Sequence, residues 1–200
     1  RSGHRVFIHD CLGPEAPKGI AENVHAVLSA HPDLIGFSAT TSSFLDGNDM
    51  ATLIKKVRPR VKTIFGGVHV SALGGALLQD FPNIDYLCPG EGEATLAELA
   101  SGKDPAAIDG LIWRDGKKII TNAPRAPLPD LDELPFPDYE GLKGFPGSYN
   151  LPLFSFIEVP GATMSTSRGC PYECSYCDRS VFKRSYRYNS PEYIYEHMKH

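Results

Sequence analysis

Apolar residues follow two alternating patterns along the first hundred positions of the chain. Short, nearly continuous apolar runs predict strands that are covered on both faces, because a half-exposed strand would alternate with polar residues. Between these runs, apolar residues recur at helical spacing, as Ile20, Val24, Val27 and Leu28 do. The expected strands cover residues 5–10, 34–38, 61–65 and 84–88, and the expected helices cover residues 20–28, 46–57, 76–81 and 94–100.

This alternation of strands and helices predicts an α/β fold with a doubly wound parallel sheet, of the flavodoxin-like or Rossmann-like class. After the sheet, apolar and β-branched residues flank the dipeptide Asp115-Gly116, which is a strong signal for a β-hairpin. We therefore assign residues 1–123 to one α/β domain that includes a hairpin over residues 111–121.

The remainder divides into a linker and the start of a second unit. Residues 124–160 are rich in proline, which predicts an extended connector. A short strand over residues 162–165 is expected to lead into a cysteine-containing loop, and Ser190-Pro191 predicts the start of a helix. Strand, loop and helix form the opening unit of a β/α barrel, so residues 161–200 are interpreted as its beginning. Because the chain starts without methionine and ends inside the last predicted helix, we expect a fragment.

Composition narrows the class of protein. Hydrophobic residues make up 42% and charged residues 22%, which suits a globular protein with a real core. The formal net charge of -4 gives no electrostatic case for binding nucleic acid. Neither a membrane span nor a signal peptide is expected. Five cysteines, three of them close together, argue against a disulfide framework and favour a reducing cytoplasm.

The most informative motif is a Cys-x3-Cys-x2-Cys spacing formed by Cys170, Cys174 and Cys177. Thiolates this close on one loop can converge on a single soft metal centre. A cubane iron–sulfur cluster normally takes four thiolates, so three would leave one iron open to a small molecule. The spacing therefore predicts a reactive 4Fe-4S cluster.

Three other interpretations compete with the open cluster. A structural zinc site needs a fourth ligand, and the nearest histidines, His197 and His200, lie far outside the compact spacing. Three unrelated buried thiols are a second alternative, but the flanking residues are polar, turn-forming or aromatic. In a third, Cys88 or Cys11 completes a closed cluster.

Polar and glycine residues gather where three of the predicted strands end. These positions meet at one rim of a parallel sheet, which is where ligands bind in such folds. Each group also has a structural interpretation, as helix caps, a tight turn or helix-favouring acidic residues. The three groups are residues 38–42, residues 66–69 and residues 90–93.

With Tyr176 just before its last cysteine, the cysteine motif resembles the radical S-adenosylmethionine (radical SAM) superfamily. The resemblance implies that Cys170, Cys174 and Cys177 ligate the cluster and that Tyr176 packs near bound S-adenosylmethionine. In that superfamily the open iron chelates S-adenosylmethionine, and an electron from the cluster converts it to a radical that takes a hydrogen atom from the substrate.

The order of parts resembles one branch of the superfamily, which carries an N-terminal cobalamin-binding domain. Its landmarks include Gly66-Gly67, the Gly90-Glu91-Gly92-Glu93 motif and the acidic, proline-containing residues 134–138. Residues 168–190 look similar to anaerobic magnesium-protoporphyrin IX monomethyl ester cyclases, oxidoreductases of bacteriochlorophyll biosynthesis. The cofactor-binding residues implied by the resemblance are Ser38, Thr40, Thr41, Gly66, Gly67, His69 and Glu91.

The resemblance implies oxidative cyclisation of a porphyrin side chain, with cobalamin-dependent methyl transfer to an unactivated carbon as the alternative. It also implies a small-molecule substrate, such as a porphyrin, and an external electron donor. His9 lacks the flanking residues of the Asp-x-His-x-x-Gly motif, so no cobalt-ligating histidine is expected from that strand. With the family's first strand and helix and most of the barrel missing, the fragment is expected to be inactive, with cobalamin affinity in doubt. The rival from another class is a non-catalytic flavodoxin-like module with a zinc site.

Overall fold

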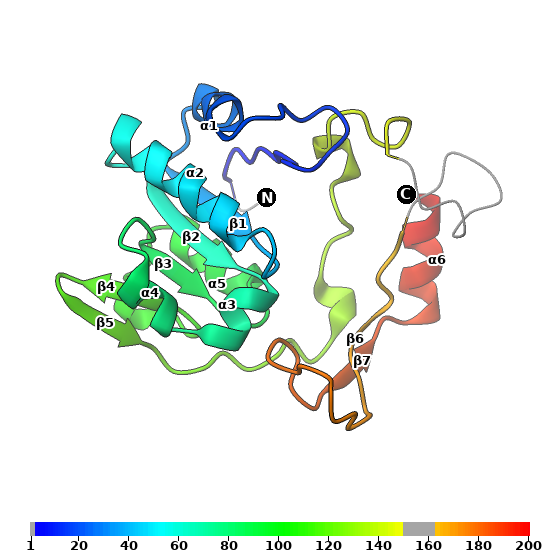
Figure 1. The fold of residues 1–200 in the computed structure, drawn as a ribbon. Coiled ribbons are helices and arrows are strands. Elements are labelled where there is room, and N and C mark those ends of the chain that lie inside the picture. Colours follow the sequence, from blue (N-terminus) through cyan, green and yellow to red (C-terminus); the bar gives the residue numbers. More distant parts are fainter. Residues whose placement is uncertain (1–2, 150–162) are drawn as a thin grey trace.

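The computed structural model of the protein describes residues 3–149 and 163–200. Figure 1 shows an α/β body, and β6, β7 and α6 lie on the other side of it from the β4–β5 hairpin. The helices are α1 (Ile20–Ser29), α2 (Phe44–Val57), α3 (Val68–Leu73), α4 (Ala76–Asp80), α5 (Glu93–Ala100) and α6 (Pro191–Lys199). The strands are β1 (Leu34–Ser38), β2 (Lys62–Gly66), β3 (Tyr86–Cys88), β4 (Ile112–Asp115), β5 (Lys118–Thr121), β6 (Ser167–Gly169) and β7 (Tyr186–Tyr188).

A five-stranded sheet in the order β1-β2-β3-β4-β5 forms the centre of the body. The first three strands are parallel, and the predicted hairpin extends the sheet with two antiparallel strands. The register places Ser38 beside Gly66 and Gly66 beside Cys88. The carboxyl ends of the three parallel strands therefore form one rim, as the sequence pattern predicts.

Helices cover both faces of the sheet, as a doubly wound fold requires. Phe65 packs with residues of α2, α3 and α4 on one face, where its ring stacks 4.4 Å from that of Phe37. Its neighbour Ile64 points to the other face, because successive strand residues alternate, and packs there beside Leu99 of α5. Helix α1 packs against α2 over Ile35. The apolar runs of β2 and β3 are therefore buried on both sides, whereas in the edge strand β1 only Ile35 is buried.

A polar network closes the sheet at the end opposite the rim. The carboxylate of Asp85 accepts hydrogen bonds from the Thr63 backbone N–H at 2.8 Å and from Lys55 Nζ at 2.5 Å. Burial alone raises the pKa of Asp85, but the hydrogen bonds from Lys55 and Thr63 outweigh it and hold this pKa below its ordinary value. The ionised side chain thus fixes the start of β2 against the loop before β3.

Two strand predictions are wrong, because one predicted strand is absent and the other lies at a later position. Residues 5–10 form no strand, and Val6 and Phe7 are 68% and 60% exposed. Their β-rich composition fits a pleated surface, but β1 is the edge of the sheet and no strand among the described residues pairs with this segment. Residues 163–165 are likewise not a strand, and position 162 lies outside the described residues. The strand before the cysteines is β6, at Ser167–Gly169, where an antiparallel partner exists in β7.

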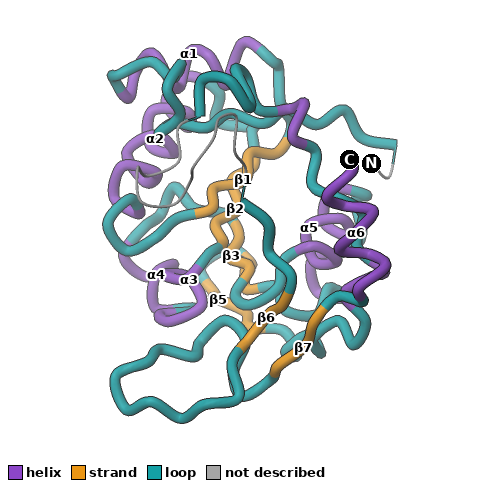
Figure 2. The backbone as a smooth tube through the Cα atoms, turned by 90° about the vertical axis from the view of Figure 1, so that its right-hand side faces the viewer, coloured by secondary structure: helices purple, strands orange, loops and turns teal. Residues whose placement is uncertain are grey.

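Three helices complete the comparison of the predicted elements with the structure. The sequence pattern missed α3, which begins directly after Gly67. Helix α2 begins at Phe44 rather than at Asp46 or Asn48, because the Phe44 side chain is buried in the core at 1% exposure. Helix α6 begins as predicted, with Ser190 Oγ accepting a hydrogen bond from the Tyr193 backbone N–H at 3.1 Å. Figure 2 shows the β6–β7 pair at one end of α6.

Candidate functional site

The rim of the sheet brings together most of the predicted cofactor-binding residues. His69 Nδ1 lies 3.1 Å from Thr41 Oγ1, so the turns after β1 and β2 are in contact. Thr40 Oγ1 lies 2.9 Å from the hydroxyl oxygen of Ser42. Ser38, Thr40 and Thr41 are exposed. The rim thus offers a ligand hydroxyl groups from the turn after β1 and the His69 side chain from the start of α3.

Gly67 permits the two turns to approach so closely. Its φ of 95° is a left-handed conformation that side chains other than glycine rarely adopt. A Cβ at this position would lie 2.6 Å from the Ala39 carbonyl oxygen. The backbone after β2 can therefore lie against the backbone after β1 only because glycine is present. Gly67 is therefore needed for structural reasons. Because it has no side chain, its backbone also stays accessible to a ligand.

The three cysteines lie on an exposed loop between β6 and β7. Cys170 follows β6 directly, and the Cys177 backbone N–H donates a 3.2 Å hydrogen bond to the Cys174 carbonyl oxygen. All three residues are exposed, and so is Tyr176, at 90%. Within residues 3–149 and 163–200, no three His, Cys, Asp or Glu side chains are arranged to hold a metal. The structure therefore places the three thiols on one short loop without converging them.

The other two cysteines take part in packing elsewhere. Cys88 is buried in a core cluster with Ile64 and Leu111, and burial raises the pKa of its thiol. Cys11 is an exposed residue, but its Sγ lies 3.8 Å from Met50 Sδ, and partial burial of the thiol together with the charge of Asp10 raises its pKa as well. A raised pKa disfavours the thiolate that binds metals. Nothing in these surroundings favours Cys88 or Cys11 as a fourth cluster ligand.

An ion-pair cluster connects the rim to the strands beside the cysteine loop. Glu91 Oε1 lies 2.8 Å from Arg168 Nη1, and Glu91 Oε2 lies 2.9 Å from Arg187 Nη1. Arg168 Nη2 also reaches Glu93 Oε1 at 2.6 Å. Burial raises the pKa of Glu91, but the hydrogen bonds from Arg187 and Arg168 more than offset it, so its pKa lies below the ordinary value. Both oxygens of Glu91 therefore bind arginine in this structure, and a cofactor contact for it stays a prediction.

A second set of contacts holds α6 to the linker. Asp132 accepts hydrogen bonds from Asn189 Nδ2 at 3.0 Å and from the Ser190 backbone N–H at 3.1 Å. The hydrogen bonds from Ser190 and Asn189 lower the pKa of Asp132. Because Asn189 directly follows β7, Asp132 and Glu91 hold neighbouring parts of the same segment.

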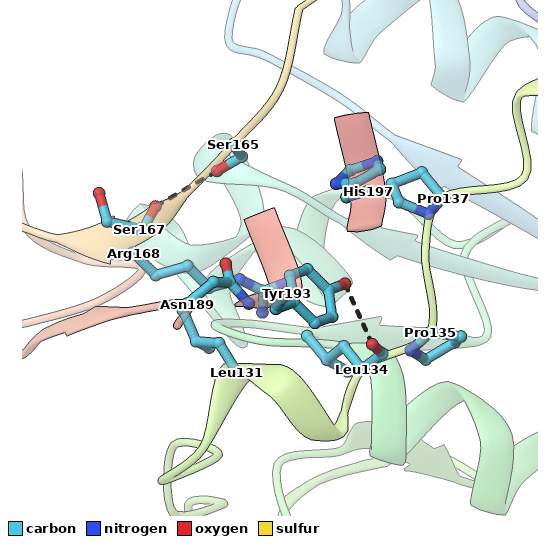
Figure 3. Close-up of a pocket in the computed structure, with 10 residues that line it drawn as sticks. All are labelled: Leu131, Leu134, Pro135, Pro137, Ser165, Ser167, Arg168, Asn189, Tyr193 and His197. Carbon is cyan, nitrogen blue, oxygen red and sulfur yellow. Dashed lines mark hydrogen bonds between the residues drawn. The ribbon is translucent and has the colours of Figure 1, made fainter. Parts of the chain in front are cut away.

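A cavity of about 120 Å³ lies between the linker, β6 and α6. Figure 3 shows Tyr193 donating a hydrogen bond to the Leu134 carbonyl oxygen, at 3.1 Å, along one wall. His197 is 7% exposed and its ring stacks on that of Phe136 at 4.9 Å. Its Nδ1 is buried and has no hydrogen-bond partner among residues 3–149 and 163–200. The cavity is small and mostly apolar, so we interpret it as part of the packing of α6.

Sequence reasoning missed the residues that join the rim of the sheet to the segment carrying the cysteine loop. Arg168, Arg187 and Asp132 received no role from their spacing, because an isolated arginine or aspartate in a sequence does not reveal its partner. The only signal was the pair of acidic residues at Glu91 and Glu93, which pattern alone assigns to the start of α5. Ser38, Thr40, Thr41, Gly66, Gly67 and His69 do share one rim, and their role as ligand contacts stays a prediction.

Known proteins similar to this chain include proteins named methyltransferases and proteins named cyclases. An uncharacterized methyltransferase, PH0819, from Pyrococcus horikoshii is 31% identical over 99% of this chain and 42% of its own length. The anaerobic magnesium-protoporphyrin IX monomethyl ester cyclase of Rubrivivax gelatinosus is 27% identical over 86% of this chain and 32% of its own length. The cobalamin-dependent radical SAM methyltransferase TokK of Streptomyces tokunonensis is 31% identical over 74% of this chain and 22% of its own length. The chain thus spans less than half of each relative.

A solved structure has the same fold over most of the chain. The radical S-adenosylmethionine methyltransferase TsrM from Kitasatospora setae, solved with cobalamin and a [4Fe-4S] cluster bound, matches with a TM-score of 0.57 at 18% identity. The match covers 88% of this chain and 36% of that one. Residues 1–100 match the family model described as the B12 binding domain. Because that match spans half of the chain, the protein belongs to the B12-binding domain family.

Proposed function

We propose that this chain carries the cobalamin-binding sheet and the cluster-binding loop of a cobalamin-dependent radical SAM enzyme. The observation that carries the proposal is the position of the Cys170, Cys174 and Cys177 loop, held through Arg168 to the rim of a sheet from the B12-binding family. The likeness to TokK, a cobalamin-dependent radical SAM methyltransferase, supports the same combination of cofactors. In this proposal residues 1–123 bind cobalamin, residues 124–160 link, and residues 161–200 begin the radical SAM core.

The three loop cysteines would ligate a 4Fe-4S cluster. Thiolate sulfur is the ligand that such clusters take, and all three thiols are exposed on one loop with no disulfide partner. The cluster with S-adenosylmethionine would supply the radical chemistry, while the protein positions and shields the cofactors. The exposed ring of Tyr176 would then gain a packing partner in the bound cofactor.

Cobalamin would lie across the rim formed by Ser38, Thr40, Thr41, Gly66, Gly67 and His69. The exposed hydroxyl groups can hydrogen-bond its amide side chains, and the side-chain-free glycine backbone permits a flat macrocycle to approach. His9 lies elsewhere, with its Nε2 2.7 Å from Asn23 Oδ1. We therefore assign it no role on cobalt.

For the whole enzyme we propose methyl transfer to an unactivated carbon of a small molecule. Two relatives at 31% identity, PH0819 and TokK, are named methyltransferases. Oxidative cyclisation of a porphyrin side chain is the second candidate, supported by the 27% identity to the Rubrivivax cyclase. Either reaction needs an electron donor to reduce the cluster, and both fit the cytoplasmic setting that the free thiols favour. The described part of the chain holds no helix that is long and apolar enough to cross a membrane.

Metal and cobalamin binding test the proposal together. The protein is reconstituted anaerobically with iron and sulfide, assayed for bound iron and zinc, and titrated with hydroxocobalamin by absorbance. We expect iron uptake that Cys174→Ala abolishes and Cys11→Ala preserves, and cobalamin binding in all three proteins. Binding of one equivalent of zinc without iron would refute the proposed 4Fe-4S site. The absence of a cobalamin spectrum in the bound fraction would refute cobalamin binding at the rim.

A further inference from the structure

Glu91 lies between two arginines that belong to paired strands. Arg168 of β6 and Arg187 of β7 are register partners in the antiparallel ladder. One carboxylate accepts hydrogen bonds from both guanidinium groups, including Arg187 Nη2 at 3.0 Å to Oε1. Like charges directly opposite each other on neighbouring strands repel. Glu91 is thus the counter-charge that permits this pair of strands to carry two arginines side by side.

The ion pairs of Glu91 are largely removed from solvent. Its side chain is 11% exposed and that of Arg187 is 13% exposed. Removing one partner of a buried ion pair is strongly destabilising, because the other charge is left without compensation. The nearby residue Glu93 is 46% exposed and pairs with Arg168, so its contribution is expected to be small.

The connections of these residues give the cluster its significance. Arg168 lies two positions before Cys170, and Arg187 lies in the strand that follows the cysteine loop. Glu91 lies in the turn after β3, where the Gly90 backbone N–H donates to Ser71 Oγ, and Ser71 Oγ donates to the Gly67 carbonyl oxygen. Both ends of the cysteine loop are therefore held by a side chain that is hydrogen-bonded, through its neighbour, to the predicted cobalamin rim.

We propose that Glu91 is a positioning residue that couples the cysteine loop to the rim of the sheet, so that binding at the rim orders the loop. That cobalamin binds at the rim and a cluster at the cysteine loop rests on the proposed function. The connection between the rim and the loop rests on the contacts of Glu91 with Arg168 and Arg187. Among the contacts of this segment, those of Glu91 are the ones that join both ends of the cysteine loop to the turn after β3. Glu91 is not assigned any contact with the reacting atoms.

Hydrogen exchange read by mass spectrometry tests this coupling without an activity assay. Wild-type protein is compared with Glu91→Gln, which keeps the side-chain shape, and with Glu98→Gln as the matched control. Glu98 also binds an arginine, Arg125 Nη2 at 2.7 Å, but this pair joins α5 to the first residues of the linker and, within the described part of the chain, does not contact β6 or β7. Exchange is measured over residues 167–169 and 186–188, and over the rim at residues 38–43, with and without hydroxocobalamin. The double variant Glu91→Gln/Arg187→Gln removes both charges and tests whether an unpaired arginine causes the effect.

In the absence of cobalamin, Glu91→Gln should speed exchange of β6 and β7 by about tenfold or more, because a nearly buried ion pair is broken. Glu98→Gln should leave β6 and β7 unchanged, and the double variant should be less affected than Glu91→Gln. With hydroxocobalamin, wild type and Glu98→Gln should gain protection at the rim and over β6 and β7, whereas Glu91→Gln should gain it at the rim alone. Unchanged exchange of β6 and β7 in Glu91→Gln, or protection of both regions by cobalamin in that variant, would overturn the proposal. If wild type binds no cobalamin, the proposed function fails, and the cobalamin-free comparison still decides whether Glu91 holds the loop.

Discussion

Replacing Gly169 with alanine should open the cysteine loop by a clash that can be located in the structure. Gly169 has φ at 87°, and a Cβ there would lie 1.8 Å from the Ser185 carbonyl oxygen and 2.8 Å from its carbonyl carbon. Both are backbone atoms, so no rotamer change can relieve the contact. The Ser185 carbonyl must move until the separation reaches at least 3.0 Å, which disturbs the adjacent Gly169–Tyr186 pair of the β6–β7 ladder.

The magnitude follows from two contributions. A left-handed backbone costs an alanine about 1–2 kcal/mol relative to glycine. Displacing the ladder adds about 1 kcal/mol for each hydrogen bond lost, so the loss of one or two brings the local cost to about 2–4 kcal/mol. Gly102→Ala is the matched control, because Gly102 has φ at 78° with no atom within 4 Å of a Cβ. Gly102→Ala should therefore cost only the backbone contribution of about 1–2 kcal/mol in local stability.

The assay is hydrogen exchange over residues 167–188, with the thermal unfolding of the sheet measured in parallel. Gly169→Ala should accelerate exchange of that segment while the sheet unfolds near the wild-type temperature. Iron uptake should fall, because the first cysteine follows Gly169 directly. If Gly169→Ala exchanges no faster in this segment than wild type, or costs no more than Gly102→Ala costs locally, then the close contact with Ser185 does not control the loop.

Three further predictions concern the sheet and its rim. The depressed pKa of Asp85 contributes stability that is present above its unfolded pKa of about 3.9 and is lost as pH falls through the folded value. Asp85→Asn should therefore lower the free energy of unfolding by about 1–3 kcal/mol at pH 7 and much less near pH 2 in urea titrations, and an equal loss at both pH values would contradict this. Gly67→Ala places a Cβ 2.6 Å from the Ala39 carbonyl oxygen and should weaken hydroxocobalamin binding about tenfold or more, whereas Gly116→Ala, with positive φ and open space, should not. Phe65→Ala empties a fully buried position and should cost about 3–5 kcal/mol in denaturant titrations, and a loss below about 1 kcal/mol would show that Phe65 is not packed in the core between the sheet and its helices.

Much of the fold could be predicted from sequence because its helices and parallel strands carry local signals. The apolar runs that became β2 and β3 are buried on both faces, and a continuous run is the pattern such strands require. The run that became β1 lies at the edge of the sheet, and of its residues only Ile35 is buried. The hairpin at Asp115-Gly116 and the start of α6 at Ser190 follow from turn and capping chemistry that a few adjacent residues specify.

The failures at the strands and at the ion pairs share a physical cause, which is dependence on a distant partner. Residues 5–10 have strand-like composition but no neighbouring strand, and β6 forms where β7 can pair with it rather than where β propensity begins. The rim residues were predicted together because parallel strands end on one side of a sheet. The role of Glu91 in binding Arg168 and Arg187 could not be predicted, because charges 77 and 96 positions apart along the chain become partners only once the fold is known.

Electron paramagnetic resonance tests the central claim most directly, namely that Cys170, Cys174 and Cys177 hold a cluster with one open iron. The reconstituted protein is reduced under anaerobic conditions and its spectrum recorded with and without S-adenosylmethionine. We predict a cubane cluster signal that shifts when S-adenosylmethionine is added and that Cys174→Ala abolishes. A protein that binds one equivalent of zinc, and gives no iron-dependent signal in either condition, would contradict the assignment.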